Sequence, residues 1–126
     1  MGERQIILWR HGRTSWNAER RFQGQSDIEL DDEGRAQAER AAELLAYLEP
    51  DRIIASDLAR AWATAQALSA RTGVHVTADA RLRETFAGEW EGLSRAELLE
   101  RHGDEVARWA SDSAARPGGG ETRIEV

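Results

Sequence analysis

The sequence has no cysteine, only two prolines and no long hydrophobic run. Without cysteine the chain forms no disulfides and offers no thiolate ligands for a metal. No apolar stretch approaches the length of a membrane span, and residues 1–5 do not have the charged and then apolar pattern of a signal sequence. These absences predict a cytoplasmic protein that does not bind membranes.

Lysine is also absent, so all 17 basic residues are arginine, and the net charge is −6. This charge argues against nucleic-acid binding, and any anion site must depend on a few local arginines. The missing lysines indicate a compositional bias, although arginine suits a bidentate grip on phosphate. A length of 126 residues with 40% apolar and 32% charged residues indicates one globular domain.

Three short apolar runs have the composition of buried strands. They cover residues 5–9, 53–55 and 74–76. Two stretches between them have helical spacing. The first follows Asp31, a good N-cap, and ends at Pro50, whereas the second is capped by Ser56 or Asp57 and ends at Gly73.

This βαβαβ order predicts a parallel sheet within an α/β fold of three layers, helices on both faces of a mostly parallel sheet. A capping box at residues 94–97 opens another helix toward Arg101, and residues 117–121 form a glycine-rich loop. Residues 122–126 resemble the beginning of a further element. We therefore expect one domain over residues 1–126 that is incomplete at its C-terminus.

The most informative residues follow the first predicted strand, where the sequence reads Arg10-His11-Gly12. In α/β folds, ligands bind outside the carboxyl ends of the strands, so a histidine and an arginine there form a candidate anion site. The same tripeptide recurs at residues 101–103 within a charged segment that no strand precedes. The position of Arg10-His11-Gly12 after a predicted strand, rather than the tripeptide itself, therefore indicates an anion site.

Phosphoryl transfer needs a nucleophile, cations for the phosphoryl oxygens and an acid for the leaving oxygen. His11 supplies an imidazole and Arg10 a fixed cation, Arg60 follows the second strand, and Glu84 follows the third. A buried, protonated Glu84 could donate a proton and later activate water. Each residue also has an ordinary interpretation, as a packing histidine, a solvated helix arginine or a loop ion-pair partner. Their common position after three successive strands favours a shared active site over these ordinary interpretations.

These residues occur within a pattern that resembles the histidine phosphatase superfamily, in its phosphoglycerate-mutase-like branch. The resemblance runs from residue 5 to the end of the chain and implies that superfamily's α/β/α fold. The matching patches are Arg10-His11-Gly12 with Thr14 and Asn17; Phe22-Gln23-Gly24 with Asp27 and Leu30; Gly34 with Gln37-Ala38; Ser56-Asp57-Leu58 with Arg60, Ala61 and Thr64; Leu82-Arg83-Glu84 with Gly88, Trp90, Glu91 and Gly92; and Gly119-Gly120-Glu121.

The resemblance implies that His11 becomes a phosphohistidine and that Arg10 and Arg60 hold the phosphoryl oxygens. It implies that Glu84 is the proton donor. The expected substrate is a small phosphate ester, and no metal or other cofactor is expected.

Three further residues, Asn17, Gln23 and Gly24, would line the phosphate and substrate entrance. The other histidines, His75 and His102, match no catalytic position and are expected to be structural. Relatives are often dimers, which makes a homodimer compatible with the resemblance.

The chain departs from the family pattern in one respect. The family has a second catalytic histidine on a later strand, before a glycine pair, and this sequence contains no such residue. Its loss from such a site would slow the reaction on the order of 10²-fold or more. We therefore expect the sequence to be a fragment of a longer enzyme.

Three functions remain open at this stage. A phosphatase is favoured over a mutase because Thr85-Phe86-Ala87 follows the acid, where mutases carry Arg-His-Tyr, and because Arg13 replaces their usual glutamate. Residues 81–92 and 118–121 are similar to actinobacterial phosphatases of glucosyl-3-phosphoglycerate. Phe86 and Trp90 either contact a substrate larger than phosphate or belong to the core. The third function is an inactive phosphate-binding module.

Overall fold

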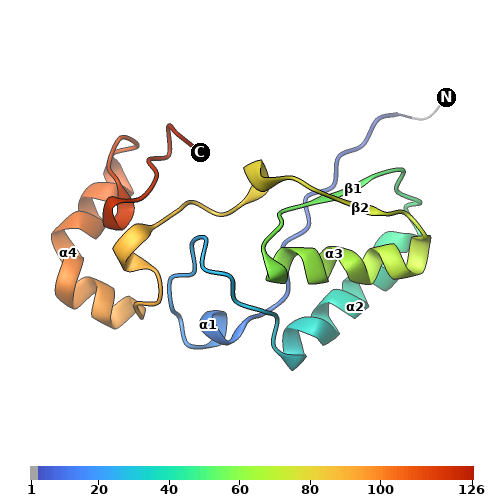
Figure 1. Cartoon of the computed structure of the whole chain (residues 1–126), viewed down its shortest axis with the longest axis horizontal. Coiled ribbons are helices and arrows are strands. Elements are labelled where there is room, and N and C mark those ends of the chain that lie inside the picture. Colours follow the sequence, from blue (N-terminus) through green and yellow to red (C-terminus); the bar gives the residue numbers. More distant parts are fainter. Residues whose placement is uncertain (1–2) are drawn as a thin grey trace.

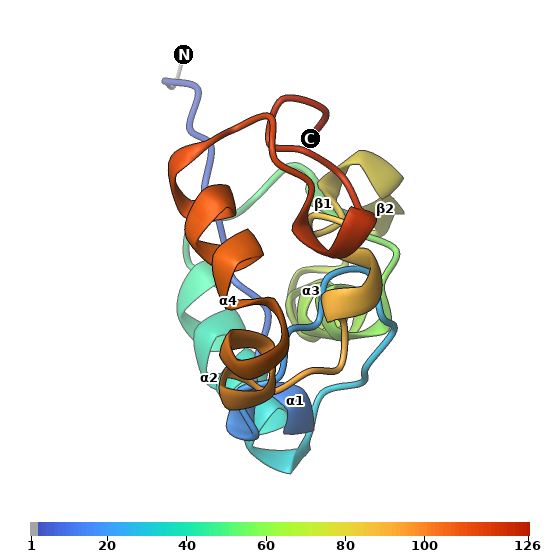
Figure 2. The same ribbon diagram turned by 90° about the vertical axis from the view of Figure 1, so that its left-hand side faces the viewer.

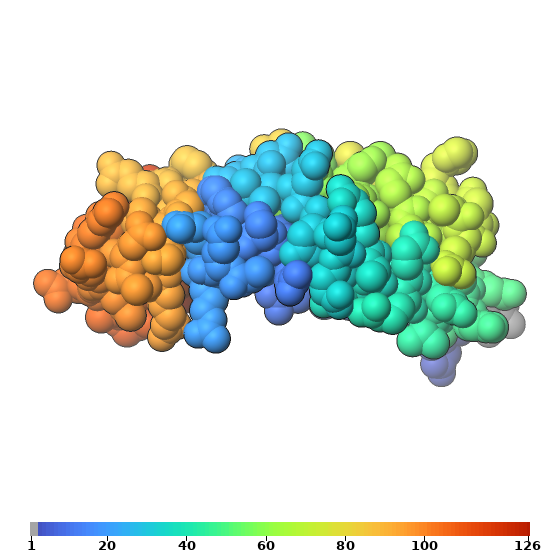
Figure 3. Space-filling view, turned by 90° about the horizontal axis from the view of Figure 1, so that it is seen from below, coloured from blue at the N-terminus to red at the C-terminus, as the bar shows by residue number. Residues whose placement is uncertain are grey.

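The computed structural model describes residues 3–126. The molecule is elongated, with two ends that differ in composition (Figures 1 and 3). We call one the sheet end; it comprises helices α2 (Asp32–Ala46) and α3 (Ala59–Thr72) with strands β1 (Ile53–Ala55) and β2 (Val76–Ala78). The other, the aromatic end, is built around helix α4 (Arg95–Ser111). The short helix α1 (Ser15–Ala18) lies between them.

The helices of the sheet end begin and end largely as the sequence predicts. Asp31 caps α2 and accepts a hydrogen bond from the Gly34 N–H at 2.7 Å. Gly73 ends α3 in the left-handed conformation, with φ of 77°. The expected caps of α3 are wrong, however, because this helix begins at Ala59, after Ser56 and Asp57, and its N-cap residue supplies no side-chain bond.

The N-terminus of α3 is instead capped by a side chain that is distant in the sequence. The carboxylate of Asp27 accepts a hydrogen bond from the Ala59 N–H at 2.7 Å. A negative charge also suits the positive end of the helix dipole. The loop that contains Asp27 is therefore fixed against α3.

Strands β1 and β2 pair in parallel, with Ile53 opposite Val76 and Ala55 opposite Ala78. This pairing confirms the parallel arrangement for these two strands. The strand expected at residues 74–76 begins later, at Val76, so His75 precedes it.

The first predicted strand is not observed. Residues 5–9 are extended, and no backbone hydrogen bond joins them to another part of the described chain. Ile6 and Leu8 are 90% and 93% exposed, so the expectation of burial is also wrong. The physical reason is the lack of a neighbour: a strand needs a partner backbone, and residues 5–9 and β1 lie on the walls of one open cavity.

The aromatic end has a core of perpendicular rings. Trp90 is 0% exposed and packs edge to face against Phe22 and Trp109, at centroid distances of 6.1 and 5.8 Å. Trp90 is thus a core residue, whereas Phe86 remains partly exposed. Ser94 caps α4 as predicted, by accepting from the Glu97 N–H at 3.2 Å.

The helix α4 extends ten residues beyond the expected limit near Arg101, and His102 interrupts its regular dihedral angles. The C-terminal loop packs on the short 3-10 helix Gly88–Trp90 (Figures 1 and 2). Residues 122–126 form a turn rather than a regular element. None of the helices described is both long and apolar enough to cross a membrane.

Candidate functional site

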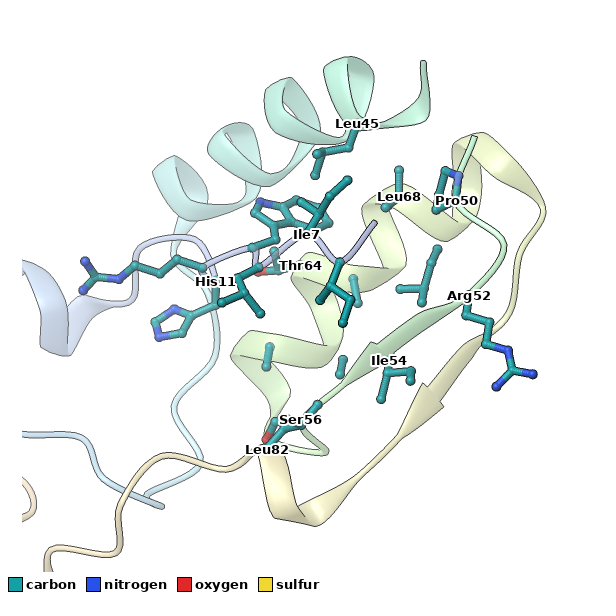
Figure 4. Close-up of a pocket in the computed structure, with 18 of the residues that line it drawn as sticks. Ile7, His11, Leu45, Pro50, Arg52, Ile54, Ser56, Thr64, Leu68 and Leu82 are labelled. Atoms are coloured by element: carbon teal, nitrogen blue, oxygen red, sulfur yellow. The ribbon is translucent and has the colours of Figure 1, made fainter. Parts of the chain in front are cut away.

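An open cavity of about 1710 Å³ lies between the N-terminal segment, β1 and α3 (Figure 4). Its polar part contains every residue that the sequence suggested for the site. These lining residues are Arg10, His11, Asn17, Gln23, Gly24, Arg60 and Glu84. Its remaining walls are largely apolar, with Ile7, Leu45 and Ile54 among their side chains (Figure 4).

The ring of His11 is fixed by its own neighbour. Nδ1 lies 2.6 Å from the carbonyl oxygen of Gly12. Because a carbonyl only accepts hydrogen bonds, Nδ1 carries the proton, and Nε2 of the neutral ring keeps a free lone pair. This is the tautomer that a nucleophile attacking through Nε2 requires.

The surroundings of His11 also favour the neutral ring. Burial lowers the pKa of His11 below its ordinary value of 6.5; the hydrogen bond to Gly12 opposes this shift. The nearby charges of Arg60 and Arg10 lower this pKa further, and Glu84 raises it. The net direction is downward, so the imidazole is neutral at neutral pH.

The backbone after His11 is anchored to α3. The Gly12 N–H donates to the Thr64 hydroxyl at 3.1 Å, and that hydroxyl donates to the Arg60 carbonyl at 2.8 Å. A side chain at residue 12 has no room, since a Cβ there would lie 2.3 Å from the carbonyl oxygen of Gly34. Thr64 and these two glycines therefore set the position of the histidine relative to the helix that carries Arg60.

Arg60 is almost fully buried, with only 1% of its surface exposed. Its Nη1 donates to the Ser26 carbonyl and its Nη2 to the Gly24 carbonyl, both at 2.6 Å. A guanidinium has five N–H groups, so three remain for an anion. Burial lowers the pKa of Arg60, while the carboxylates of Glu84, Asp27 and Glu91 raise it. Arg10, by contrast, is exposed.

Asn17 and Gln23 line the cavity and also hold the first loop together. Asn17 completes a capping box with Thr14, whose N–H donates to Asn17 Oδ1 at 2.9 Å. The Thr14 hydroxyl donates to Gln23 Oε1 at 2.6 Å. Both amide oxygens are thus occupied, which leaves the two amide NH₂ groups as donors toward a bound anion.

Glu84 is exposed, so the expectation that this residue is buried is wrong. It lies on an irregular segment between two 3-10 helices, where few side chains cover it. Its neighbour Arg83 fixes this segment by an ion pair with Asp57, at 2.6 and 2.5 Å, and Gln25 donates to the Glu84 carbonyl at 3.2 Å. The backbone of the candidate acid is therefore anchored although its carboxyl reaches solvent.

The other histidines lie elsewhere. His75 is exposed directly before β2, and the ring of His102 lies 6.4 Å from that of Trp90 in the aromatic end. Among residues 3–126, no group of three or more potential ligands could hold a metal ion.

Several residues that support the site had no expected role. Thr64, Asp27 and Glu91 belong to the motifs quoted above. Thr64 accepts from the Gly12 N–H and Asp27 from the Ala59 N–H, each next to a residue that lines the cavity, and Glu91 accepts from the Ser26 hydroxyl. The available signal was that the same motifs contain Arg60, Gly24 and Glu84. Spacing alone could not reveal which backbone groups they bind.

Taken together, the cavity has a neutral histidine near two arginines beside the carboxyl end of β1, and these features define an α/β protein with a candidate site for a phosphate-like anion. The sequence model of the histidine phosphatase superfamily (branch 1) matches residues 6–126. The chain belongs to this superfamily.

Several relatives have names that indicate phosphate chemistry. The chain is 45% identical to a glucosyl-3-phosphoglycerate phosphatase of Mycobacterium tuberculosis, over 100% of this chain and 56% of the relative. It is 41% identical to phosphoglycerate mutase-like protein 4 of Arabidopsis thaliana, over 94% of this chain and 53% of the relative. The chain thus spans about half the length of the curated relatives it matches.

Solved structures show the same fold. A mycobacterial glucosyl-3-phosphoglycerate phosphatase in complex with VO₃ superimposes with a TM-score of 0.83 and 46% identity, over 90% of this chain and 57% of that chain. A second structure, named mycobacterial hydrolase 1, gives a TM-score of 0.86 at 44% identity, over 91% of this chain and 54% of that one. These likenesses confirm the α/β, phosphoglycerate-mutase-like fold class.

Proposed function

We propose that the protein is a phosphomonoester phosphatase that works through a phosphohistidine on His11. The observation that carries this proposal is the hydrogen bond from His11 Nδ1 to the Gly12 carbonyl, which leaves Nε2 free in the cavity that Arg60 also lines. The names of the relatives support the reaction class.

In the proposed first step, His11 Nε2 attacks phosphorus and the bond from phosphorus to the ester oxygen breaks. The leaving oxygen takes a proton from the Glu84 carboxyl, which must enter the step protonated. Arg10 and Arg60 neutralise the phosphoryl oxygens while charge develops on them. The products are the free alcohol and a phosphohistidine.

In the second step, water attacks the phosphohistidine and the nitrogen-to-phosphorus bond breaks. The Glu84 carboxylate now takes the proton of the water, which restores its acid form. Inorganic phosphate leaves, and His11 returns to its neutral tautomer. The exposure of Glu84 gives water and a leaving alcohol access to the group that exchanges protons with both.

The substrate we propose is a small phosphorylated metabolite, with glucosyl-3-phosphoglycerate as the first to test, because relatives at 44 to 45% identity carry that substrate in their names. A phosphoglycerate mutase is the second candidate, since a Caulobacter vibrioides mutase is 43% identical over 82% of this chain. The phosphatase is preferred because Arg13, at the position of the mutases' glutamate, is paired with Asp31 at 2.7 Å.

The test uses the full-length gene product with His11→Ala, Glu84→Gln and the exposed His75→Ala as a matched control. We expect His11→Ala to abolish phosphate release and the formation of an acid-labile phosphoenzyme without unfolding the protein. Glu84→Gln should slow release about 10² to 10⁴-fold with little loss of phosphate binding, and His75→Ala should be unchanged.

Each alternative gives a different result. Undiminished turnover in His11→Ala would refute the mechanism. Conversion of 3-phosphoglycerate to 2-phosphoglycerate, with little release of phosphate, would favour the mutase. Phosphate binding by the wild type without turnover of any ester would identify an inactive binding module.

A further inference from the structure

We propose that Glu91 is a positioning residue for Arg60, which it holds through the turn at residues 24–26. The expected effect of Glu91 on kcat and KM rests on the proposed phosphatase function, whereas its expected effect on phosphate affinity does not. Glu91 lies far from both His11 and Arg60 in the sequence, in the segment that leads to the aromatic end.

The Glu91 carboxylate receives three hydrogen bonds. Its Oε1 accepts from the Ser26 hydroxyl at 2.6 Å, and its Oε2 accepts from the Gln25 N–H at 3.2 Å and from the Ala87 N–H at 2.9 Å. Two of these donors belong to the turn, and the third belongs to a fully buried residue of the aromatic core. The carboxylate therefore joins the turn to the rigid end of the molecule.

The opposite side of the same turn holds the guanidinium of Arg60. The carbonyls of Gly24 and Ser26 accept its Nη2 and Nη1. The turn is thus bound on its donor side by a carboxylate and on its carbonyl side by a cation. Such an arrangement polarises the Gly24–Gln25 peptide group, whose carbonyl binds Arg60 and whose N–H binds Glu91, and strengthens both bonds.

The fit of the turn against Glu91 is close. Gly24 has φ of 53°, and a Cβ on this residue would lie 2.4 Å from Glu91 Oε2. The backbone can therefore approach the carboxylate only because residue 24 is glycine. This contact gives the turn one position, and with it one position for the two carbonyls that bind Arg60.

The negative charge of Glu91 has a second effect. It is one of the carboxylates that raise the pKa of Arg60 against the effect of burial. Removal of the carboxylate leaves the Ser26, Gln25 and Ala87 donors without their acceptor and removes a compensating charge. The buried cation would then lose its fixed geometry toward phosphate, although Glu91 itself does not line the cavity.

The experiment compares Glu91→Ala and Glu91→Gln with the matched control Glu97→Ala in the full-length gene product. Glu97 is also in the aromatic end and binds Arg21 at 3.1 Å, but it makes no contact with the turn. The affinity for inorganic phosphate is measured by calorimetry, the activity as kcat and KM, and the stability as Tm.

We expect Glu91→Ala to weaken phosphate binding about tenfold, in line with the loss of hydrogen bonds to a charged group. Glu91→Gln keeps one acceptor oxygen and should restore part of that loss. In an Arg60→Met background, Glu91→Ala should produce no further loss, because the effect passes through Arg60. Glu97→Ala should leave phosphate affinity unchanged.

A lower Tm with unchanged phosphate affinity would overturn the proposal and leave Glu91 a purely structural residue, as would equal losses with and without Arg60. If Glu91→Ala does not fold, the comparison of Glu91→Gln with the wild type decides the question. Failure of the phosphatase function gives another result: ester turnover independent of His11, with phosphate affinity still dependent on Glu91. A wild type that binds no phosphate overturns both proposals.

Discussion

The two ends of the molecule differ in how completely they bury their apolar side chains. In the aromatic end, Trp90 is fully buried by Phe22 and Trp109, with the C-terminal loop packed beside it. In the sheet end, the core consists mainly of alanines and short strands, and Ile54 of β1 remains 53% exposed. The described chain therefore completes one core and leaves the other open on one side.

The candidate site lies between the two ends, and its residues differ in how they are anchored. Arg60 and the turn at residues 24–26 are joined to the aromatic end by Glu91, through hydrogen bonds on both sides of the turn. His11 follows a segment in which residues 5–8 are exposed and Trp9 is partly buried, and it is anchored to α3 through the bond from Gly12 to Thr64. The candidate cation Arg60 and the candidate nucleophile His11 thus differ in how many contacts hold them.

The sharpest test of the comparison is the removal of one large side chain from each end. Trp90→Ala should lower the free energy of unfolding by about 3 to 5 kcal/mol, because it opens a cavity in a closed core. Ile54→Ala should cost less than about 1 kcal/mol, because that side chain is already half in water. Denaturant unfolding of the full-length protein measures both.

A milder change controls for the chemistry of the ring. The indole N–H of Trp90 is buried and has no acceptor among residues 3–126, so Trp90→Phe should cost much less than Trp90→Ala. Equal losses for Trp90→Ala and Ile54→Ala would break the comparison, since they would mean that the open end is covered in solution.

The next effect concerns the tie between His11 and the sheet end. Gly12→Ala would place a methyl group 2.3 Å from the Gly34 carbonyl, and the backbone must shift to relieve this clash. We expect a loss of about 1 to 3 kcal/mol in unfolding free energy and a lower kcat, because His11 moves with the backbone.

Gly103→Ala in α4 is the matched control, since a Cβ there meets no atom within 4 Å. Alanine is the better helix former, so this variant should be neutral or stabilised by up to about 1 kcal/mol. A Gly12→Ala enzyme with normal kcat and stability would show that the first loop adjusts freely, which contradicts the close packing described.

The smallest effect is the titration of His11. Burial places its pKa below 6.5, so the imidazole stays neutral as the pH falls through 6.5 and gains its proton only at the lower pKa of the folded state. The stability linked to this group is therefore complete above 6.5 and is lost as the pH falls from 6.5 through the lower pKa of the folded state, whereas the acid limb of the activity follows that lower pKa alone. NMR titration of the His11 ring measures the midpoint.

Arg60→Met should raise this midpoint because it removes a nearby positive charge, whereas Arg108→Met on α4 should not change it. A wild-type midpoint at or above 6.5 would mean that His11 is more solvated than the structure shows. Such a midpoint would also mean that the segment around His11 is less rigid than its contacts indicate.

The local elements followed directly from the sequence wherever a single residue fixes the backbone. Asp31 and Ser94 cap the starts of α2 and α4, and Gly73 ends α3, as the sequence predicts. A side-chain oxygen at an N-cap, or a left-handed residue at a helix end, depends only on backbone groups within one turn of the helix. The segment at residues 5–9 failed as a strand because its apolar composition is necessary but not sufficient. A strand also needs a backbone beside it, which composition does not report.

The residues of the candidate site were named from the sequence because they follow successive strands and occur in recognisable motifs. The cavity brings all seven together. Their roles as site residues stay predictions. The exposure of Glu84 was not foreseen, because it depends on which segments cover the acid rather than on its neighbours in the sequence.

The sequence alone determined the superfamily pattern, the N-caps of α2 and α4, the end of α3, and the identity of the candidate nucleophile, cation and acid, since these depend on residue type and order. Only the tertiary structure decided which tautomer His11 adopts, that Asp27 caps α3, and that Glu91 and Arg60 grip opposite sides of one turn. The His11 tautomer depends on how the backbone turns at the adjacent Gly12, and the other features are hydrogen bonds between groups distant along the chain. Their geometry exists only once the backbone has folded and brought the partners within reach.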